Sequence, residues 1–309
     1  MEKFEVHILG CGSALPTTRH FATSQVVNIR EKLFMIDCGE GAQMQLRKSK
    51  LKFTRLNHIF ISHLHGDHCF GLMGLISTFG MLGRTATLYI HCHAELERLL
   101  TPQHDFFCKG MSYKVVFQTF DPGKAEIIYD DRSLTIETIP LRHRIPTCGF
   151  LFSEKQIPAH IRRDMIDFYE IPVYELNRIK NGADYTLPDG KIVPNNKLTI
   201  PSALPRRYAY CSDTIYLPHI IEQIYGVDLL FHEATFAQSE QARAKATFHT
   251  TASQAGEIAR TAKVKQHLIG HFSARYEDES ILLQEASDIF PNTLLARETL
   301  KISIESIKP

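Results

Sequence analysis

The sequence lacks several features that would each assign it to a particular class of protein. Its 35 Lys and Arg side chains nearly balance its 34 Asp and Glu side chains, which excludes a globally basic nucleic-acid coat. The least polar long stretch, residues 69–83, is too short and too rich in glycine to span a bilayer. Acidic residues at positions 2 and 5 stand where a secretory signal would need an apolar core. We therefore expect a soluble, cytoplasmic protein that does not bind membranes.

The cysteines also lack a recognisable pattern. Seven of them are scattered along the chain, and no two form a C-x-x-C pair. This usage predicts reduced, mostly buried thiols and disfavours a disulfide framework or a cysteine zinc site.

Apolar segments of strand length alternate with helix-like segments along the 309 residues. The first half is rich in strands with hairpin-like spacing, and the second half alternates strand and helix. Expected helices include residues 41–48, 68–79, 251–262 and 280–289. The pattern predicts a mixed α/β fold with two sheets and helices outside them.

One long segment, at about residues 154–206, breaks this alternation. It is polar and rich in proline, with one short helical stretch near residues 161–169. A connection of this length inside a compact domain is usually functional or flexible. Residues 154–207 hold nine Lys or Arg and seven Asp or Glu, a net charge of 9 − 7 = +2. We interpret the segment as an inserted, protruding arm on a single domain that covers residues 1–309, because metal-type residues lie on both sides of it.

The strongest chemical signal is an H-x-H-x-D-H motif at residues 63–68, which directly follows a buried strand and precedes a helix. Three imidazoles and a carboxylate within six residues would each need a buried partner if they were packing groups. Neutral imidazole and carboxylate are instead the ligands that Zn²⁺ and related metals prefer. The motif therefore predicts a metal site.

Further candidate side chains follow other apolar strands. They are His143, Asp213, Glu233 and His271. Each is a weak signal alone, because a single polar residue at a strand end is usually a surface group. Strand ends converge on one crevice in open α/β sheets, so together with the motif they form a set.

These motifs resemble the metallo-β-lactamase superfamily and, within it, the ribonuclease Z family of tRNA 3′-processing endonucleases. The resemblance spans nearly the whole chain and rests on residues 34–40, 62–68, 212–214, 232–236, 249–251 and 271–276. It implies an αβ/βα four-layer sandwich. The segments H-E-A-T-F and H-T-T, together with the arm, favour the ribonuclease Z branch.

The resemblance implies two zinc ions per chain. One would be held by His63, His65, His143 and Asp213, and the other by Asp67, His68, Asp213 and His271. Asp213 would bridge the two metals. Two metals about 3.5–4 Å apart can activate a water molecule and stabilise charge on a phosphate.

The resemblance also implies roles for residues outside the ligand set. Asp67 could take a proton from the attacking water, and His249, supported by Glu233, would protonate or stabilise the departing 3′-oxygen. The glycine-rich loop at residues 10–20 resembles a family loop beside the active site, so Pro16 and Arg19 are candidate substrate-binding residues. His20 stands where asparagine is usual in that family.

The chain is therefore expected to be a zinc-dependent endoribonuclease that cleaves precursor tRNA and leaves a 3′-hydroxyl. The family resemblance also suggests a homodimer. An alternative is a hydrolase of small phosphodiesters or arylsulfates with the same metal set. A non-catalytic RNA-binding relative is disfavoured, because no expected ligand is missing.

Overall fold

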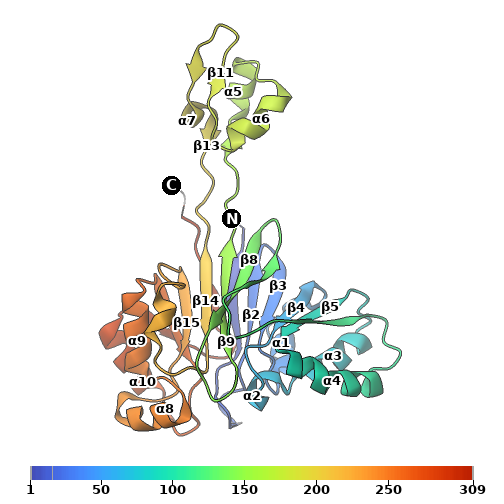
Figure 1. The fold of residues 1–309 in the computed structure, drawn as a ribbon, viewed down its shortest axis with the longest axis vertical. Coiled ribbons are helices and arrows are strands. Elements are labelled where there is room, and N and C mark those ends of the chain that lie inside the picture. Colours follow the sequence, from blue (N-terminus) through green and yellow to red (C-terminus); the bar gives the residue numbers. More distant parts are fainter. Residues whose placement is uncertain (1, 16, 308–309) are drawn as a thin grey trace.

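The computed structural model describes residues 2–15 and 17–307. Two large sheets face each other, and helices cover their outer faces, so the predicted four-layer αβ/βα sandwich is confirmed (Figure 1). All seven cysteines are buried and free. No helix in the described ranges is both long and apolar enough to cross a membrane.

The first sheet is built from the N-terminal half of the chain and one C-terminal strand. Its order is β18-β1-β2-β3-β4-β5-β6, and the last three pairings are parallel. The strands are β1 (Phe4–Gly10), β2 (Ser24–Ile29), β3 (Lys32–Ile36), β4 (Leu56–Phe60), β5 (Leu88–Cys92), β6 (Val115–Thr119) and β18 (Lys301–Ser303). The helices in this half are α1 (Ala42–Lys48), η1 (Phe53–Arg55), α2 (Gly66–Cys69), α3 (Leu72–Met81) and α4 (Ala94–Phe107).

The second sheet is built from the rest of the chain. Its order is β17-β16-β15-β14-β9-β8-β7, with parallel pairing among β14 to β17. The strands are β7 (Ile127–Asp130), β8 (Leu134–Pro140), β9 (Cys148–Glu154), β14 (Arg207–Cys211), β15 (Leu229–Glu233), β16 (Gln266–Gly270) and β17 (Thr293–Leu295). The helices are η2 (Pro218–Ile221), η3 (Gln238–Glu240), α8 (Gln241–Thr247), α9 (Ala252–Thr261) and α10 (Ser280–Ile289).

The main core lies between the two sheets and is dominated by aromatic rings. Phe34 of the first sheet meets Phe152 of the second with ring centroids 6.0 Å apart, and Phe60 meets Phe150 at 5.6 Å. Burying each such ring stabilises the fold by about 1.5–3 kcal/mol. A second core lies under α1, α3 and α4, and a third under α9. This packing fixes how the two sheets, and hence their strand ends, face each other.

The helix expected over residues 68–79 is split into α2 and α3 by a close backbone approach at Gly71. The Gly71 N–H donates to the carbonyl of Cys38 at 2.9 Å. A Cβ at position 71 would lie 2.2 Å from the Gly39 carbonyl oxygen, so only glycine fits. This contact places α2 against the loop that follows β3.

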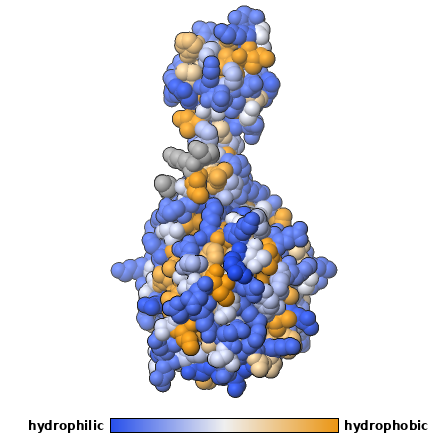
Figure 2. Space-filling view, turned by 90° about the vertical axis from the view of Figure 1, so that its left-hand side faces the viewer, coloured by the Kyte–Doolittle hydropathy of each residue, from blue (hydrophilic) through white to orange (hydrophobic). Residues whose placement is uncertain are grey.

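The arm leaves the sandwich after Glu154 and returns at Arg206. Its elements are β10 (His160–Ile161), α5 (Arg163–Phe168), α6 (Val173–Lys180), β11 (Tyr185–Thr186), β12 (Ile192–Val193), α7 (Asn195–Leu198) and β13 (Thr199–Ile200). They form a compact head on a narrow stem (Figures 1 and 2). The head has its own small core around Ile171, Ile179 and Leu198. The single helix expected here is therefore an underestimate: Pro172 starts a second one, α6.

A buried ion pair closes the base of the arm. The Arg206 guanidinium donates two hydrogen bonds to the Glu154 carboxylate, at 2.8 and 2.9 Å, and a third to the Ile304 carbonyl. Such paired geometry holds two chain segments in register. The base of the arm therefore belongs to the packed body.

Candidate metal centre

The H-x-H-x-D-H motif spans the turn that follows the end of β4 and the start of α2. His63 and His68 are almost fully buried, with 1% and 0% of their surface exposed. His65 occupies the N-cap position of α2 and keeps an extended backbone. The strand-to-helix turn therefore gathers the motif's side chains at one end of the sheet.

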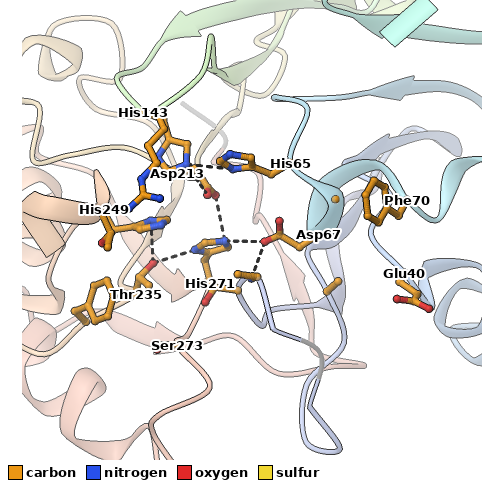
Figure 3. Close-up of a pocket in the computed structure, with 17 residues that line it drawn as sticks. Glu40, His65, Asp67, Phe70, His143, Asp213, Thr235, His249, His271 and Ser273 are labelled. Atoms are coloured by element: carbon orange, nitrogen blue, oxygen red, sulfur yellow. Dashed lines mark hydrogen bonds and ion pairs between the residues drawn. The ribbon is translucent and has the colours of Figure 1, made fainter. Parts of the chain in front are cut away.

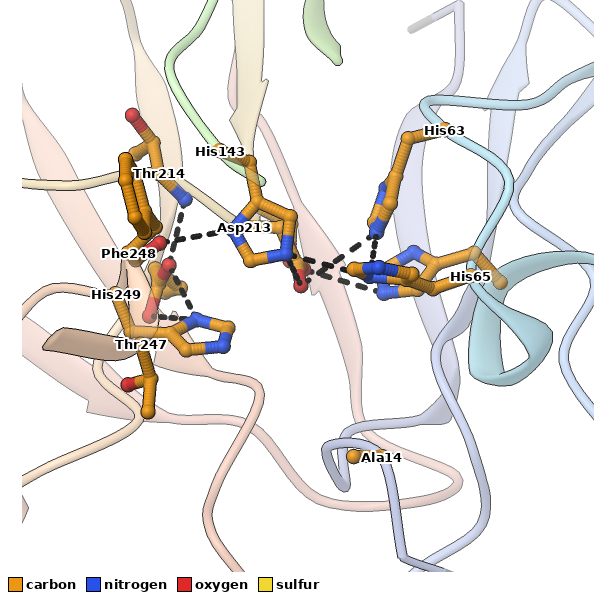
Figure 4. Close-up of polar contacts among 12 residues, drawn as sticks. Ala14, His63, His65, His143, Asp213, Thr214, Thr247, Phe248 and His249 are labelled. Carbon is orange, nitrogen blue, oxygen red and sulfur yellow. Dashed lines mark hydrogen bonds and ion pairs between the residues drawn. The ribbon is translucent and has the colours of Figure 1, made fainter. Parts of the chain in front are cut away.

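Four side chains from three separate segments form the first donor set. The Nδ1 atom of His65 lies 3.1 Å from His63 Nε2 and 3.2 Å from His143 Nε2. Asp213 Oδ2 lies 3.6 Å from the Nε2 atoms of both His63 and His143 (Figure 4).

The second donor set shares Asp213. Its other oxygen, Oδ1, lies 3.1 Å from His68 Nε2 and 3.2 Å from His271 Nε2. Asp67 Oδ2 lies 3.5 Å from each of the same two nitrogens. Figure 3 shows Asp67, Asp213 and His271 converging on one point. The two oxygens of Asp213 thus face different donor sets.

These donors fit divalent metals of the zinc type. A tetrahedral zinc with bonds of about 2.0–2.1 Å requires ligand atoms about 3.3 Å apart, and the donor distances given above are 3.1–3.6 Å. The buried Nε2 atoms of His68 and His271 form no aligned hydrogen bond within the described residues, although Asp213 Oδ1 lies 3.1 and 3.2 Å from them. Buried nitrogens without partners are costly unless a ligand satisfies them.

The second ring nitrogen of several histidines is fixed by a neighbouring group. His143 Nδ1 donates to the Phe248 carbonyl at 2.9 Å, and His271 Nδ1 meets the Thr235 hydroxyl at 2.9 Å. His68 Nδ1 contacts Asp37 Oδ2 at 2.7 Å. Contacts of this kind select the tautomer that leaves Nε2 free to bind a metal.

Asp37 is a supporting residue that the sequence motifs did not single out. It is fully buried and adopts a φ of +54°, a left-handed conformation that is strained for aspartate. Its carboxylate accepts from the Ser62 N–H at 2.8 Å and from the Tyr210 hydroxyl at 2.7 Å. Asp37 therefore joins the motif to β14, across 173 residues of sequence. Asp37 directly follows β3, just as the predicted ligands follow other strands. This position is the sequence signal that could have identified it.

Glu233 and His249 form a second functional unit beside the donor sets. Glu233 is fully buried and accepts from the backbone N–H groups of Thr214 at 2.7 Å and Thr250 at 3.1 Å. His249 Nδ1 lies 3.0 Å from Glu233 Oε1. Burial alone would lower the pKa of His249, but the Glu233 carboxylate raises it to about 9. The Glu233 contact therefore favours the protonated ring.

A cavity of about 630 Å³ opens over both units (Figure 3). It is lined by candidate site residues from both sheets, among them His65, Asp67, His143, Asp213, His249 and His271. Such a cavity can take a phosphodiester and its two flanking groups. The structure thus brings together the seven predicted ligands, Glu233 and His249.

The two predicted substrate-binding residues stand apart from this group. Pro16 lies outside the described residues. Arg19 does not line the cavity: its guanidinium donates to the Tyr276 carbonyl and lies 3.8 Å from Glu279.

The unusual His20 is explained by its neighbours. Its two ring nitrogens lie 3.1 Å from the carboxylates of Glu298 and Glu279. The hydrogen bond to Glu298 raises the pKa of His20. These contacts of His20 with Glu298 and Glu279 anchor the loop at residues 10–20. In the same loop, the Ala14 N–H donates to Asp67 Oδ2 at 2.7 Å. His20 therefore supports the centre from a distance.

Comparison with known proteins gives matches over the first half and over the whole chain. The family model described as "Anti-Pycsar protein Apyc1" matches residues 4–158. The matched segment contains five of the seven candidate ligands and ends before Asp213 and His271.

Full-length relatives are closely similar. The chain is 99% identical over 309 residues to a ribonuclease Z of Phocaeicola vulgatus, with 100% of both chains covered. It is 72% identical over 304 residues to a ribonuclease Z of Bacteroides fragilis, covering 98% of this chain and 100% of the relative. The crystal structure of human tRNase Z, short form, superposes with a TM-score of 0.70 at 24% identity, covering 97% of this chain and 99% of the other. That last likeness supports the fold alone.

Proposed function

The chain belongs to the ribonuclease Z family, and from this premise we propose how its own residues carry out tRNA 3′ processing. The protein is an endoribonuclease that acts on tRNA. We propose that it cuts precursor tRNA on the 3′ side of the acceptor stem and leaves a 3′-hydroxyl on the tRNA. The observation that carries this proposal is Asp213, whose two oxygens each face a separate donor set.

The proposed cofactor is a pair of zinc ions per chain. The first donor set is His63, His65, His143 and Asp213, and the second is Asp67, His68, Asp213 and His271. When bound, the metals supply Lewis acidity to the phosphate and to a water molecule. All ligands are imidazole or carboxylate, which suits zinc and related metals.

Two side chains are proposed to handle the protons. Asp67, which is itself a member of the second donor set, accepts the proton of the attacking water through its carboxylate. His249 is protonated and lines the cavity, so it can give a proton to the departing 3′-oxygen. Glu233 holds the His249 ring through Nδ1, which leaves Nε2 for the substrate. Pro16 and Arg19 remain proposed contacts for the 3′ end.

The arm is proposed to hold RNA for a partner chain. β9 and β14 run from the centre to the arm, so the base of the arm lies at the strand ends opposite the ligands (Figure 1). The seven residues from Arg207 to Asp213, which make six steps of a largely extended chain, alone span about 20 Å. The head lies farther away still, which favours a homodimer in which each arm presents RNA to the other subunit's centre. A cytoplasmic location is part of the same proposal, because it is consistent with the free, buried cysteines.

The alternative, hydrolysis of small phosphodiesters or arylsulfates, uses the same donor sets. A small substrate provides no reason for an arm with its own packed head. The arm therefore favours RNA.

Mapping the cut in a precursor tRNA tests the proposed reaction. The expected products are a tRNA ending in a 3′-hydroxyl at the end of the acceptor stem and a trailer with a 5′-phosphate. Treatment with a chelator should stop the reaction. Hydrolysis of small diesters without any cleavage of precursor tRNA would favour the alternative.

Mixing two defective variants tests the proposed dimer. One variant joins Glu154 to Arg206 by a short loop and lacks the arm, and the other carries Asp213→Ala. Each alone should fail on precursor tRNA. A mixture allowed to exchange subunits should recover cleavage, since one subunit supplies the arm and the other the centre. Two folded variants that exchange subunits without recovering activity would show that the arm serves its own centre.

A further inference from the structure

Arg144 occupies a distinctive position at the rim of the cavity. It follows the predicted ligand His143 on the loop between β8 and β9, and its side chain is exposed. Among the described residues that line the cavity, it is the only Lys or Arg. The nearby Arg275 is paired with Glu240 at 3.0 Å, whereas the Arg144 guanidinium forms no ion pair within residues 2–15 and 17–307.

The loop that carries Arg144 is held from several directions. The Leu141 N–H donates to the Thr147 carbonyl at 3.3 Å, and the Ile215 N–H donates to the Arg142 carbonyl at 3.0 Å. The neighbouring His143 is fixed by its bond to the Phe248 carbonyl (Figure 4). The backbone near Arg144 is therefore positioned before any substrate arrives, while its guanidinium stays free to bind.

The charge of the cavity explains what Arg144 is suited to bind. Besides His249, whose protonated form Glu233 favours, its other charged lining residues are the carboxylates Glu40, Asp67 and Asp213. Both donor sets are directed at the phosphate that is cleaved, so they do not neutralise neighbouring phosphates. A guanidinium forms two parallel hydrogen bonds with a phosphate and keeps its charge at any working pH.

The position of His249 indicates which neighbouring phosphate is involved. The neighbouring His143 donates through Nδ1 to the carbonyl of Phe248, the residue before His249, so the loop that carries Arg144 packs against the segment that carries His249. His249 marks the departing 3′-oxygen, which belongs to the tRNA. We propose that Arg144 binds a backbone phosphate on the tRNA side of the cleaved bond, an inference that rests on the proposed function.

Arg144→Ala should lower kcat/KM on precursor tRNA by about 10- to 100-fold, as expected for one hydrogen-bonded charge. Most of the loss should appear in KM, because the flanking phosphate does not react. The slope of log kcat/KM against log salt should become shallower by about one unit. Arg144→Lys should keep part of the activity, since it retains the charge without the paired geometry.

Two controls separate this role from damage to the centre. Bis(p-nitrophenyl) phosphate has no flanking phosphate, so Arg144→Ala should hydrolyse it at the wild-type rate. Arg142 is exposed on the same loop but does not line the cavity, so Arg142→Ala should have little effect on either substrate.

Substrates with a single neutral methylphosphonate linkage locate the contact. At one linkage on the tRNA side, the methylphosphonate should lower the activity of the wild type. The same substitution in the substrate should cause no further loss in Arg144→Ala, because the contact is already missing. Equal losses on RNA and on the small diester, equal effects of the Arg142 and Arg144 variants, or a sensitive linkage on the trailer side would each overturn the proposal. Cleavage of precursor tRNA by the wild type tests the proposed function itself. The ratio of kcat/KM between the wild type and Arg144→Ala tests the role of Arg144.

Discussion

Removal of His249 should separate protonation of the leaving group from every other part of the reaction. The ring lies 3.0 Å from Glu233, which is fully buried and also accepts two backbone N–H bonds. Those bonds stabilise the carboxylate, and the carboxylate keeps His249 protonated, with a pKa of about 9. This arrangement favours a ring that already carries the proton when the reaction begins.

The size of the effect follows from this arrangement. General-acid catalysis contributes a factor of about 10²–10⁴, equivalent to about 3–5 kcal/mol in the barrier. His249→Ala should lose this factor on precursor tRNA, whose 3′-oxygen leaves poorly without a proton. It also leaves the buried Glu233 without its partner, which can destabilise the fold. His249→Asn retains a donor to Glu233 but has no proton to give, so it should fold well and show the same loss.

Single-turnover cleavage of precursor tRNA, compared with hydrolysis of bis(p-nitrophenyl) phosphate, provides the assay. p-Nitrophenolate leaves as a stable anion and needs little help. We expect a large loss on RNA, a small loss on the diester and an unchanged metal content. If both variants lost the same factor on both substrates, His249 would position the centre without serving the leaving group.

Three further changes test other parts of the structure. Asp213→Ala should abolish activity and lower the metal content, because both donor sets share this carboxylate; retention of two metals with normal turnover would exclude the bridging role. The variant without the arm should keep its metal and hydrolyse small diesters while precursor-tRNA binding weakens; unchanged RNA affinity would remove the arm from recognition. His20 has a raised pKa, so its charge stabilises the fold below about pH 6.5 and this contribution disappears as the pH rises through the folded-state value. The difference in Tm between wild type and His20→Asn should therefore shrink at alkaline pH, and a constant difference would contradict the ion-pair role.

Local signals predicted the parts of the molecule that local sequence determines. The helix expected at residues 280–289 coincides with α10, and the helix expected at residues 251–262 is α9. Its N-cap is Thr251, which forms a capping box with Gln254, and not the preceding Thr250 that the sequence suggested. The H-x-H-x-D-H motif lies within six residues, so its chemistry is visible without the fold.

Features that depend on distant contacts could not be predicted in the same way. Asp37 acts on the motif through a contact with His68 and is held by Tyr210, which no spacing rule connects to it. The free guanidinium of Arg144 is distinguishable from that of Arg19 only because the fold pairs Arg19 with Tyr276 and Glu279. Helix α4 also continues through Pro102 to Phe107, although an interior proline usually ends or kinks a helix.

Zinc titration of metal-free protein tests the central claim most directly, because seven side chains are assigned to two sites that share Asp213. The bound metal and the cleavage of precursor tRNA would be measured on the same samples. The account predicts two zinc ions per chain, with cleavage at the end of the acceptor stem appearing fully only when both are bound. Full cleavage by a chain that holds one metal or none would contradict it.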